Sequence, residues 1–139
     1  MRLWHYALIP YLPRKQLLSQ WRECCAIAKS IKEKGTPNHI LVNKITEYWD
    51  SEFNAYADLV ALEMEQRGYK VDERKFYQHR HDNNTKFEGI IFDHWHNDRY
   101  LRQCMSNLSE KYDCGGITAT EWVELLNGYK RISGRTYQP

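Results

Sequence analysis

The chain has 139 residues, which is the usual size of one domain and is enough to bury a hydrophobic core. Hydrophobic residues make up 42% of the sequence and aromatic residues 14%, which excludes an intrinsically disordered protein. The formal net charge is only +2, so binding to nucleic acid would have to depend on a local basic patch rather than on total charge.

The N-terminal segment and the cysteines indicate a cytoplasmic protein. His5, Tyr6 and Pro10 interrupt the apolar residues at the start, so no signal-peptide core forms. No stretch is long and apolar enough to span a bilayer, and we predict no contact with membranes. The four cysteines lack the spacing of a metal or redox motif, so we expect free thiols in a reducing compartment: Cys24, Cys25, Cys104 and Cys114.

Residues 1–13 are predicted to form an ordered, non-helical arm. Pro10 and Pro13 lack a backbone N–H and suit the approach to a helix rather than its interior. From Arg14 onward, apolar residues recur at intervals of three and four, which predicts a first helix that ends before Gly35. These residues are Leu17, Leu18, Trp21, Cys24, Cys25 and Ala28. The sequence GTPNH at 35–39 then breaks the helix.

A second, long helix is predicted between His39 and Gly68, because the apolar residues keep the helical period and Gly68 suits a C-terminal cap. Its apolar residues are Tyr48, Trp49, Phe53, Tyr56, Leu59, Val60 and Met64. Residues 70–97 are polar and are expected to form an irregular connection with one short element. A third helix is predicted to begin at Asn97 or Asp98.

A fourth helix is predicted after the turn at residues 115–116, because Thr118 and Glu121 have the spacing of a capping box. Its apolar stripe ends before Gly128, so residues 129–139 are predicted to form a basic and aromatic tail. The elements together predict one all-α domain over residues 1–139, a compact monomeric bundle of about three to four helices with an ordered N-terminal arm. Three tryptophans on apolar stripes are predicted to be core residues: Trp4, Trp21 and Trp49.

Arg22 and Glu23 are neighbours on the first predicted helix and lie about 100° apart around its axis. They cannot both face the core, so at least one of them must face solvent or a cleft. Ser19 and Gln16 lie on the same side of the helix as Glu23, which gives a short polar lane beside the apolar stripe. The arm is long enough to fold back across this lane.

The sequence MRLWHYALIPYLPRKQLLSQWRECCAI at residues 1–27 resembles the start of the phage and bacterial pyrimidine-dimer DNA glycosylase/AP lyase family. The segments TPNHIL, EMEQRGYKV and HNDRYLRQC are similar to later parts of the same family. The resemblance implies a small, all-helical DNA repair enzyme that needs no cofactor and acts on double-stranded DNA with a lesion or an abasic site. It also implies that the N-terminal amine attacks the sugar of the damaged nucleotide, forming an imine and releasing the base.

On the matching positions, the resemblance implies that Glu23 assists catalysis and that Arg22 contacts a phosphate near the lesion. The amine would belong to Met1, because the bulky side chain of Arg2 should block removal of the initiator methionine. An α-amine is less basic than most lysine side chains, so part of it is unprotonated at neutral pH. Further contacts with DNA are expected from basic residues of the arm, the first helix and the tail: Arg2, Arg14, Lys15, Lys130 and Arg131.

Three positions differ from the phage members of the family, the first being Arg2, which stands where those members expose a small residue after removal of the initiator methionine. Gln16 stands where those members have a histidine, and Ala26 where they have an arginine that grips DNA. The lesion could therefore be a pyrimidine dimer or another one. A second hypothesis is a non-catalytic DNA-binding or protein-interaction module on the same fold. A third is a zinc protein, because four histidines form two His-x-His pairs: His79 with His81, and His94 with His96. The preferred interpretation assigns no metal.

Overall fold

A computed structural model describes residues 1–85 and 89–139, and all of its regular elements are helical. Among these residues, four long helices form the fold: α1 (Arg14–Lys34), α2 (Asp50–Gln66), α4 (Asp98–Asp113) and α5 (Ala119–Ser133). The shorter elements are the 3-10 helices η1 (Tyr6–Tyr11) and η2 (Asn43–Glu47) and the helix α3 (Arg74–Tyr77). The predicted all-α bundle is confirmed.

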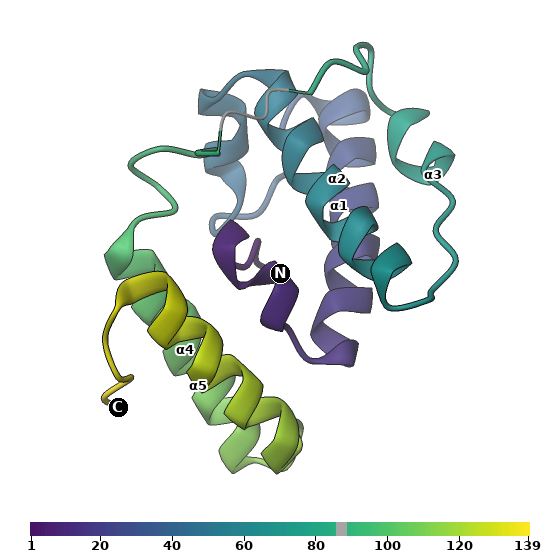
Figure 1. The fold of residues 1–139 in the computed structure, drawn as a ribbon. Coiled ribbons are helices and arrows are strands. Elements are labelled where there is room, and N and C mark those ends of the chain that lie inside the picture. The colour runs from purple at the N-terminus through teal and green to yellow at the C-terminus, as the bar shows by residue number, and fades with distance from the viewer. Residues whose placement is uncertain (86–88) are drawn as a thin grey trace.

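The helices form two pairs, with the N-terminal arm between them. Helices α1 and α2 pack against each other, α3 packs on α1, and α4 and α5 form a second, antiparallel pair (Figure 1). The element η1 of the arm contacts both α2 and α5. Most apolar side chains of the arm are therefore buried: Leu3, Trp4, Leu8, Ile9 and Leu12. The arm is a central part of the hydrophobic core, which fixes its path.

The arm is ordered, but the prediction that it is non-helical is wrong, because Tyr6–Tyr11 form a 3-10 helix. Pro10 fits within this helix because the fixed φ of proline is compatible with 3-10 geometry. The ring nitrogen Nδ1 of His5 accepts a backbone N–H at 3.1 Å and caps the start of the helix. The guanidinium group of Arg67 donates to the carbonyl oxygens of Leu12 and Pro10 at 2.8 and 3.1 Å, which fixes the end.

The second long helix begins later than predicted, because η2 forms a separate turn and α2 starts only at Asp50. Trp49 has an extended backbone, and its N–H donates to Oε2 of Glu52 at 3.2 Å, which closes the first turn of α2. Trp49 is 73% exposed, so its predicted place in the core is wrong. The same prediction is confirmed for the other two tryptophans, Trp4 and Trp21.

In its described residues, the connection between α2 and α4 contains one short helix, α3, as predicted. Residues 86–88 of the connection lie outside the described part of the chain. Helix α4 begins at Asp98, and Oδ1 of Asn97 caps it by accepting the N–H of Tyr100 at 2.9 Å. All four cysteines are free thiols. Within the described residues, no helix combines the length and the apolar character needed to cross a bilayer.

Helix α5 has the predicted capping box but continues beyond Gly128 to Ser133. Gly128 lies inside the helix and packs against the ring of Tyr11, and a side chain is excluded there because a Cβ atom would be 2.4 Å from Cγ of that ring. The chain leaves the helix at Gly134, whose φ of 72° is typical of a glycine cap. The predicted tail is therefore helical up to Ser133, and Lys130 and Arg131 are helix residues.

Candidate active site

Gln20 is a fully buried polar residue that fixes the start of the arm against α1. Its Oε1 accepts the backbone N–H of Trp4 at 2.8 Å, and its Nε2 donates to the carbonyl oxygen of Arg2 at 2.9 Å. The same Nε2 donates to Oε2 of Glu23 at 3.1 Å. One side chain therefore joins the first residues of the chain to the carboxylate of Glu23.

Two buried tyrosines complete this anchoring from other helices. The hydroxyl of Tyr56, on α2, donates to the carbonyl oxygen of Trp4 at 2.6 Å. The hydroxyl of Tyr100, on α4, donates to the carbonyl oxygen of Leu3 at 2.5 Å. Burial raises the pKa of both phenols, so both remain protonated donors. Because α1, α2 and α4 each hold the arm, the whole fold sets the position of its first residues.

Met1 and Glu23 line one cavity of about 320 Å³. The wall of this cavity also includes the cationic residues Arg2, Lys15 and Lys111. Among the described residues, Glu23 is the single carboxylate of the wall, so the field inside favours an anionic ligand. The ion pairs of the described residues do not include one between the Met1 amine and Glu23, so neither charge is paired with the other.

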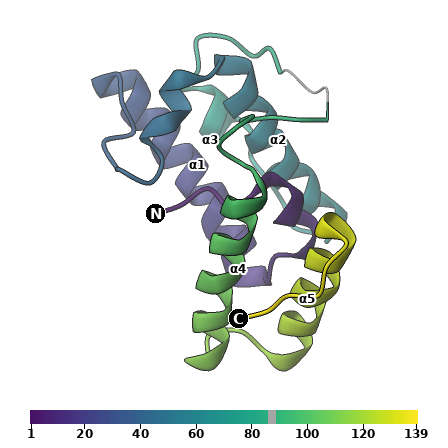
Figure 2. The same cartoon turned by 90° about the vertical axis from the view of Figure 1, so that its left-hand side faces the viewer.

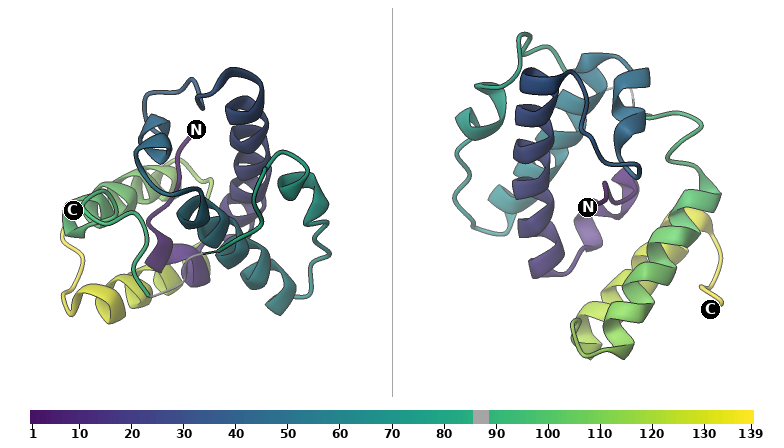
Figure 3. Two further views of the ribbon diagram at one scale, coloured as in Figure 1. Left: turned by 90° about the horizontal axis from the view of Figure 1, so that it is seen from above. Right: turned by 180° about the vertical axis from the view of Figure 1, so that it is seen from behind.

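A second cavity of about 550 Å³ adjoins the first and shares Arg2, Leu41 and Asn107 with it. Its wall adds the cationic residues Lys44 and Arg99 and, within the described part of the chain, no acidic residue. We call the two cavities together the cationic cleft. Its wall residues come from the arm, α1, the connection from α1 to α2, and α4 with the residues before it, and Figure 3 shows how these elements lie around the N-terminus. Five cationic side chains thus surround one carboxylate: Arg2, Lys15, Lys44, Arg99 and Lys111.

The structure brings some of the predicted site residues together and separates others. Four of them line the cationic cleft: Met1, Arg2, Lys15 and Glu23. Arg22 is exposed and donates to Oγ of Ser19 at 3.1 Å, so it lies next to a residue of the cleft wall. Arg14 does not line the cleft, because its guanidinium group lies over the ring of Tyr69 at 5.6 Å.

The two basic residues of the predicted tail also lie outside the cleft. Lys130 and Arg131 are exposed on the last turns of α5 and line neither cavity. In Figure 2 and in the left view of Figure 3, α4 stands between α5 and the N-terminus. Contact of these two residues with a ligand in the cleft would therefore require a ligand that extends past α4.

Sequence reasoning missed several residues of the site. For Gln20 a signal was present, because it lies among the apolar residues Leu17, Trp21 and Cys24, and a polar group at a buried position has to be hydrogen-bonded. For three cationic residues of the cleft the sequence contained no such signal, because they come from distant elements that meet only in the fold. These residues are Lys44, Arg99 and Lys111.

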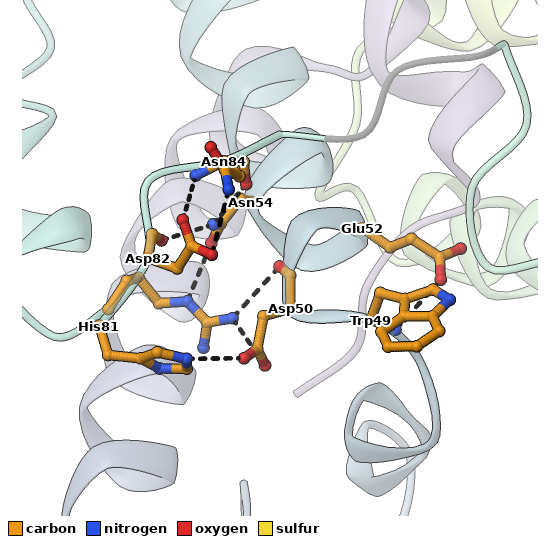
Figure 4. Close-up of polar contacts among 8 residues, drawn as sticks. Trp49, Asp50, Glu52, Asn54, His81, Asp82 and Asn84 are labelled. Carbon is orange, nitrogen blue, oxygen red and sulfur yellow. Dashed lines mark hydrogen bonds and ion pairs between the residues drawn. The ribbon is translucent and has the colours of Figure 1, made fainter.

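The histidines of the zinc hypothesis lie apart. His96 is buried, with its Nδ1 accepting the N–H of Tyr6 at 3.0 Å, whereas His94 is on the surface. Nε2 of His81 lies 3.2 Å from Oδ2 of Asp50, at the edge of a hydrogen-bond network that fixes residues 82–84 to α2 (Figure 4). In the part of the chain that the structure describes, no three His, Cys, Asp or Glu side chains could hold a metal ion. The zinc hypothesis therefore has no donor set.

The sequence model of the pyrimidine dimer DNA glycosylase family matches residues 1–77, which comprise the arm, α1, η2, α2 and α3. The chain belongs to this family. Searches among curated proteins and among solved structures found no match. The protein is thus a DNA repair enzyme of the pyrimidine dimer DNA glycosylase family, and its substrate is DNA.

Family membership agrees with the charge of the cleft, because the phosphate backbone of DNA is a polyanion. Met1, Gln20 and Glu23 all lie in the matched segment of this DNA glycosylase. The opposite wall comes from α4, which lies outside the match and contributes Arg99 and Lys111. The cleft therefore combines a family-typical half with a half that the family model does not cover.

Proposed function

We propose that this DNA glycosylase also has AP-lyase activity and works through an imine between the Met1 amine and C1′ of the damaged nucleotide in double-stranded DNA. The observation that carries the proposal is the shared cavity of Met1 and Glu23, whose wall has one carboxylate among the described residues. A cationic cleft with a single carboxylate suits a reaction that binds a polyanion and passes through a cationic sugar.

The first step of the proposed reaction releases the base. The lone pair of the Met1 nitrogen forms a bond to C1′, and the glycosidic bond breaks with its electrons moving to the base. The carboxylate of Glu23 stabilises the positive charge that develops on the sugar. The nitrogen then loses a proton to Glu23, which passes it to O4′ as the sugar ring opens and leaves a protonated imine.

The second step breaks the DNA strand by β-elimination. Glu23 takes a proton from C2′, and the electrons of that bond form a double bond between C2′ and C3′. The bond from C3′ to oxygen breaks at the same time, and the phosphate leaves. Water then hydrolyses the imine and restores the free Met1 amine.

The basic residues are assigned to phosphate binding according to their distance from the cleft. Arg2 and Lys15 contact the phosphates next to the reacting sugar, and Arg22 contacts a phosphate at the rim. The residues outside the cleft are assigned to more distant phosphates: Arg14, Lys130 and Arg131. The lesion is a pyrimidine dimer or another damaged base with an accessible C1′.

Borohydride trapping tests the imine directly. Duplex DNA with a pyrimidine dimer or an abasic site, incubated with the protein and sodium borohydride, should give a covalent complex, and peptide mapping should find the DNA on Met1. Acetylation of the N-terminal amine should abolish the complex. A protein whose Met1 amine is free but that gives no adduct, or an adduct on a lysine, contradicts the mechanism.

Replacing Glu23→Gln separates chemistry from binding. The amide keeps the size of the side chain but cannot carry a proton, so turnover should fall by about a hundredfold or more while DNA binding stays close to wild type. Glu33→Gln, at an exposed position near the end of α1, is the matched control and should have no effect. A non-catalytic module would show no turnover in the wild-type protein.

A further inference from the structure

Ile40 and Leu41 are adjacent aliphatic residues in the connection between α1 and α2, and both face outward. Ile40 is 86% exposed and Leu41 46%. Water is an unfavourable surrounding for such side chains, although single exposed aliphatic residues are common on protein surfaces. What distinguishes this pair is the rigidity of its turn and its place in the cleft.

The turn that presents the pair is held by hydrogen bonds. Oδ1 of Asn43 accepts the N–H of His39 at 2.8 Å, and the carbonyl oxygen of His39 accepts the N–H groups of Val42 and Asn43 at 3.0 and 2.9 Å. Nδ1 of His39 accepts the N–H of Leu41 at 3.3 Å. Val42, the next residue, is fully buried and anchors the turn in the core. The pair therefore projects from a preformed support.

The pair lies where the two cavities of the cationic cleft meet. Ile40 lines the larger cavity, and Leu41 lines both that cavity and the one that contains Met1 and Glu23. The right view of Figure 3 shows the connection between α1 and α2 descending toward the N-terminus. The larger cavity also contains Arg2 and Lys44. A DNA strand whose phosphates contact these cations would bring its bases onto the two aliphatic side chains.

We propose that Ile40 and Leu41 form a wedge that enters the base stack of double-stranded DNA beside the lesion. The proposal rests on the proposed function in that it takes the cleft as the DNA site. Aliphatic side chains that enter between base pairs unstack them and kink the duplex, and the cost of unstacking is offset by protein contacts. Here the offsetting contacts are the burial of exposed aliphatic surface and the phosphate contacts of the flanking cations.

The wedge would also open the base stack, which the reaction requires. An enzyme that acts on one nucleotide of a duplex has to open the stack before its groups reach the reacting atom. Because Leu41 lines the cavity of Met1 and Glu23, a stack opened by the wedge is opened next to the attacking amine. A surface for a protein partner would not need cationic residues beside its aliphatic side chains, whereas the cavities that Ile40 and Leu41 line also contain Arg2 and Lys44, so DNA fits this patch better.

The test compares the double variant Ile40→Ala/Leu41→Ala with the wild-type protein on two substrates. On a fully paired duplex with a lesion, strand cleavage should fall about tenfold, or by about 1.4 kcal/mol. On the same lesion in an unpaired bulge, which is already unstacked, cleavage should stay close to wild type. Leu62→Ala and Val123→Ala, at residues 51% and 52% exposed outside the cleft, are matched controls.

A second measurement does not depend on the chemistry. A 2-aminopurine next to an abasic site should brighten when Glu23→Gln protein binds, and this increase should disappear when the two alanine changes are added. Unchanged cleavage, or an equal loss on paired and bulged DNA, overturns the wedge. If the double alanine variant instead loses contact with a second copy of the chain and cleaves DNA at the wild-type rate, the pair is an interface between copies and the wedge is also overturned. A wild-type protein that brightens 2-aminopurine but forms no trapped imine would instead contradict the proposed function alone.

Discussion

Gln20 links the arm, α1 and Glu23 through one amide, so its replacement should affect stability and chemistry together. Gln20→Met keeps the length of the side chain but leaves the N–H of Trp4 and the carbonyl oxygen of Arg2 without their partner. The free energy of unfolding should fall by about 1–3 kcal/mol, because buried polar groups are left unpaired. Denaturant unfolding measures this loss.

The same variant should lower kcat more than it raises KM, because the cationic residues proposed to bind phosphate remain while the arm and Glu23 lose their common support. Gln16→Met is the matched control for stability, since Oε1 of Gln16 has no partner among the described residues. Equal losses of stability in the two variants would contradict the structural role of Gln20.

Gly128 is a second residue at which one substitution should have a large effect, because the absence of a side chain lets the ring of Tyr11 pack closely against the helix. Alanine normally stabilises a helix interior relative to glycine, but at this position its Cβ would be 2.4 Å from the ring of Tyr11. We expect Gly128→Ala to destabilise the protein by about 1–3 kcal/mol, as overpacking usually does. Thermal unfolding measures the effect, with Asn127→Ala on the exposed face as the control. An increase in stability would show that Tyr11 moves away freely.

At the residue level, the sequence allowed the exposure of at least one of Arg22 and Glu23 to be predicted but not the exposure of Trp49. The position of Glu23 on the cleft wall agrees with the expectation that at least one member of the charged pair faces solvent or a cleft, and the resemblance of the arm to a family singled out Glu23. Trp49 was misplaced because its position fits the apolar period, yet α2 begins only after it and leaves the ring in solvent. Periodicity identifies a face only where a helix is formed.

At the level of elements, Glu121 joins the starts of two helices. One carboxylate oxygen accepts the N–H of Thr118 at 3.0 Å in the capping box of α5, and the other accepts the N–H of Arg14, the first residue of α1, at 3.2 Å. These hydrogen bonds hold the pKa of Glu121 below its ordinary value. The N-termini of α1 and α5 are therefore linked by one side chain.

Removal of the other half of the capping box should weaken α5. Thr118→Ala deletes the hydroxyl that accepts the N–H of Glu121 at 3.1 Å, and should lower the free energy of unfolding by about 1 kcal/mol. Denaturant unfolding with an unchanged m-value would show a pure loss of stability. Thr120→Ala, at an exposed position in the same turn, should change stability much less. The prediction fails if the two alanine variants are alike.

The elements with strong apolar periods and caps could be predicted from sequence: α1, α4 and the start of α5. The short 3-10 helices could not, since a few hydrogen bonds are too weak to define them without tertiary contacts. The end of α5 was missed for a related reason. Gly128 looks like a helix stop in sequence, whereas in the structure the helix continues through it, and the contact with Tyr11 explains why this position is a glycine.

On the scale of the whole molecule, two buried histidines should make stability depend on pH. Burial lowers the pKa of His5 to about 4, and burial followed by the nearby His5 lowers the pKa of His96 well below its ordinary value. Above the unfolded pKa of about 6.5, both states are neutral and the stability is complete. As the pH falls from about 6.5 toward 4, the unfolded chain binds protons that the folded chain does not, so stability falls.

The expected slope is up to about 1.4 kcal/mol per pH unit for each histidine. Denaturant unfolding between pH 4 and pH 8 measures it. In His96→Asn, an amide oxygen can replace Nδ1 as the acceptor for the N–H of Tyr6. The slope should then decrease by up to about 1.4 kcal/mol per pH unit, which is the contribution of one histidine. An unchanged slope in this variant would assign the pH dependence to other groups.

The central position of the arm has a consequence for the order of synthesis. The hydroxyl that holds the carbonyl oxygen of Leu3 belongs to Tyr100, which is 97 positions further along and is therefore synthesised later. Contacts of such long separation close slowly and only after most of the chain is available. An incomplete chain that ends after α3 would contain the Met1 amine and Glu23 but would lack the α4 anchor of the arm. The anchor of the arm on α4 therefore forms only after α4 has been made, so under the proposed mechanism an unfinished chain would lack the complete support of its Met1 amine.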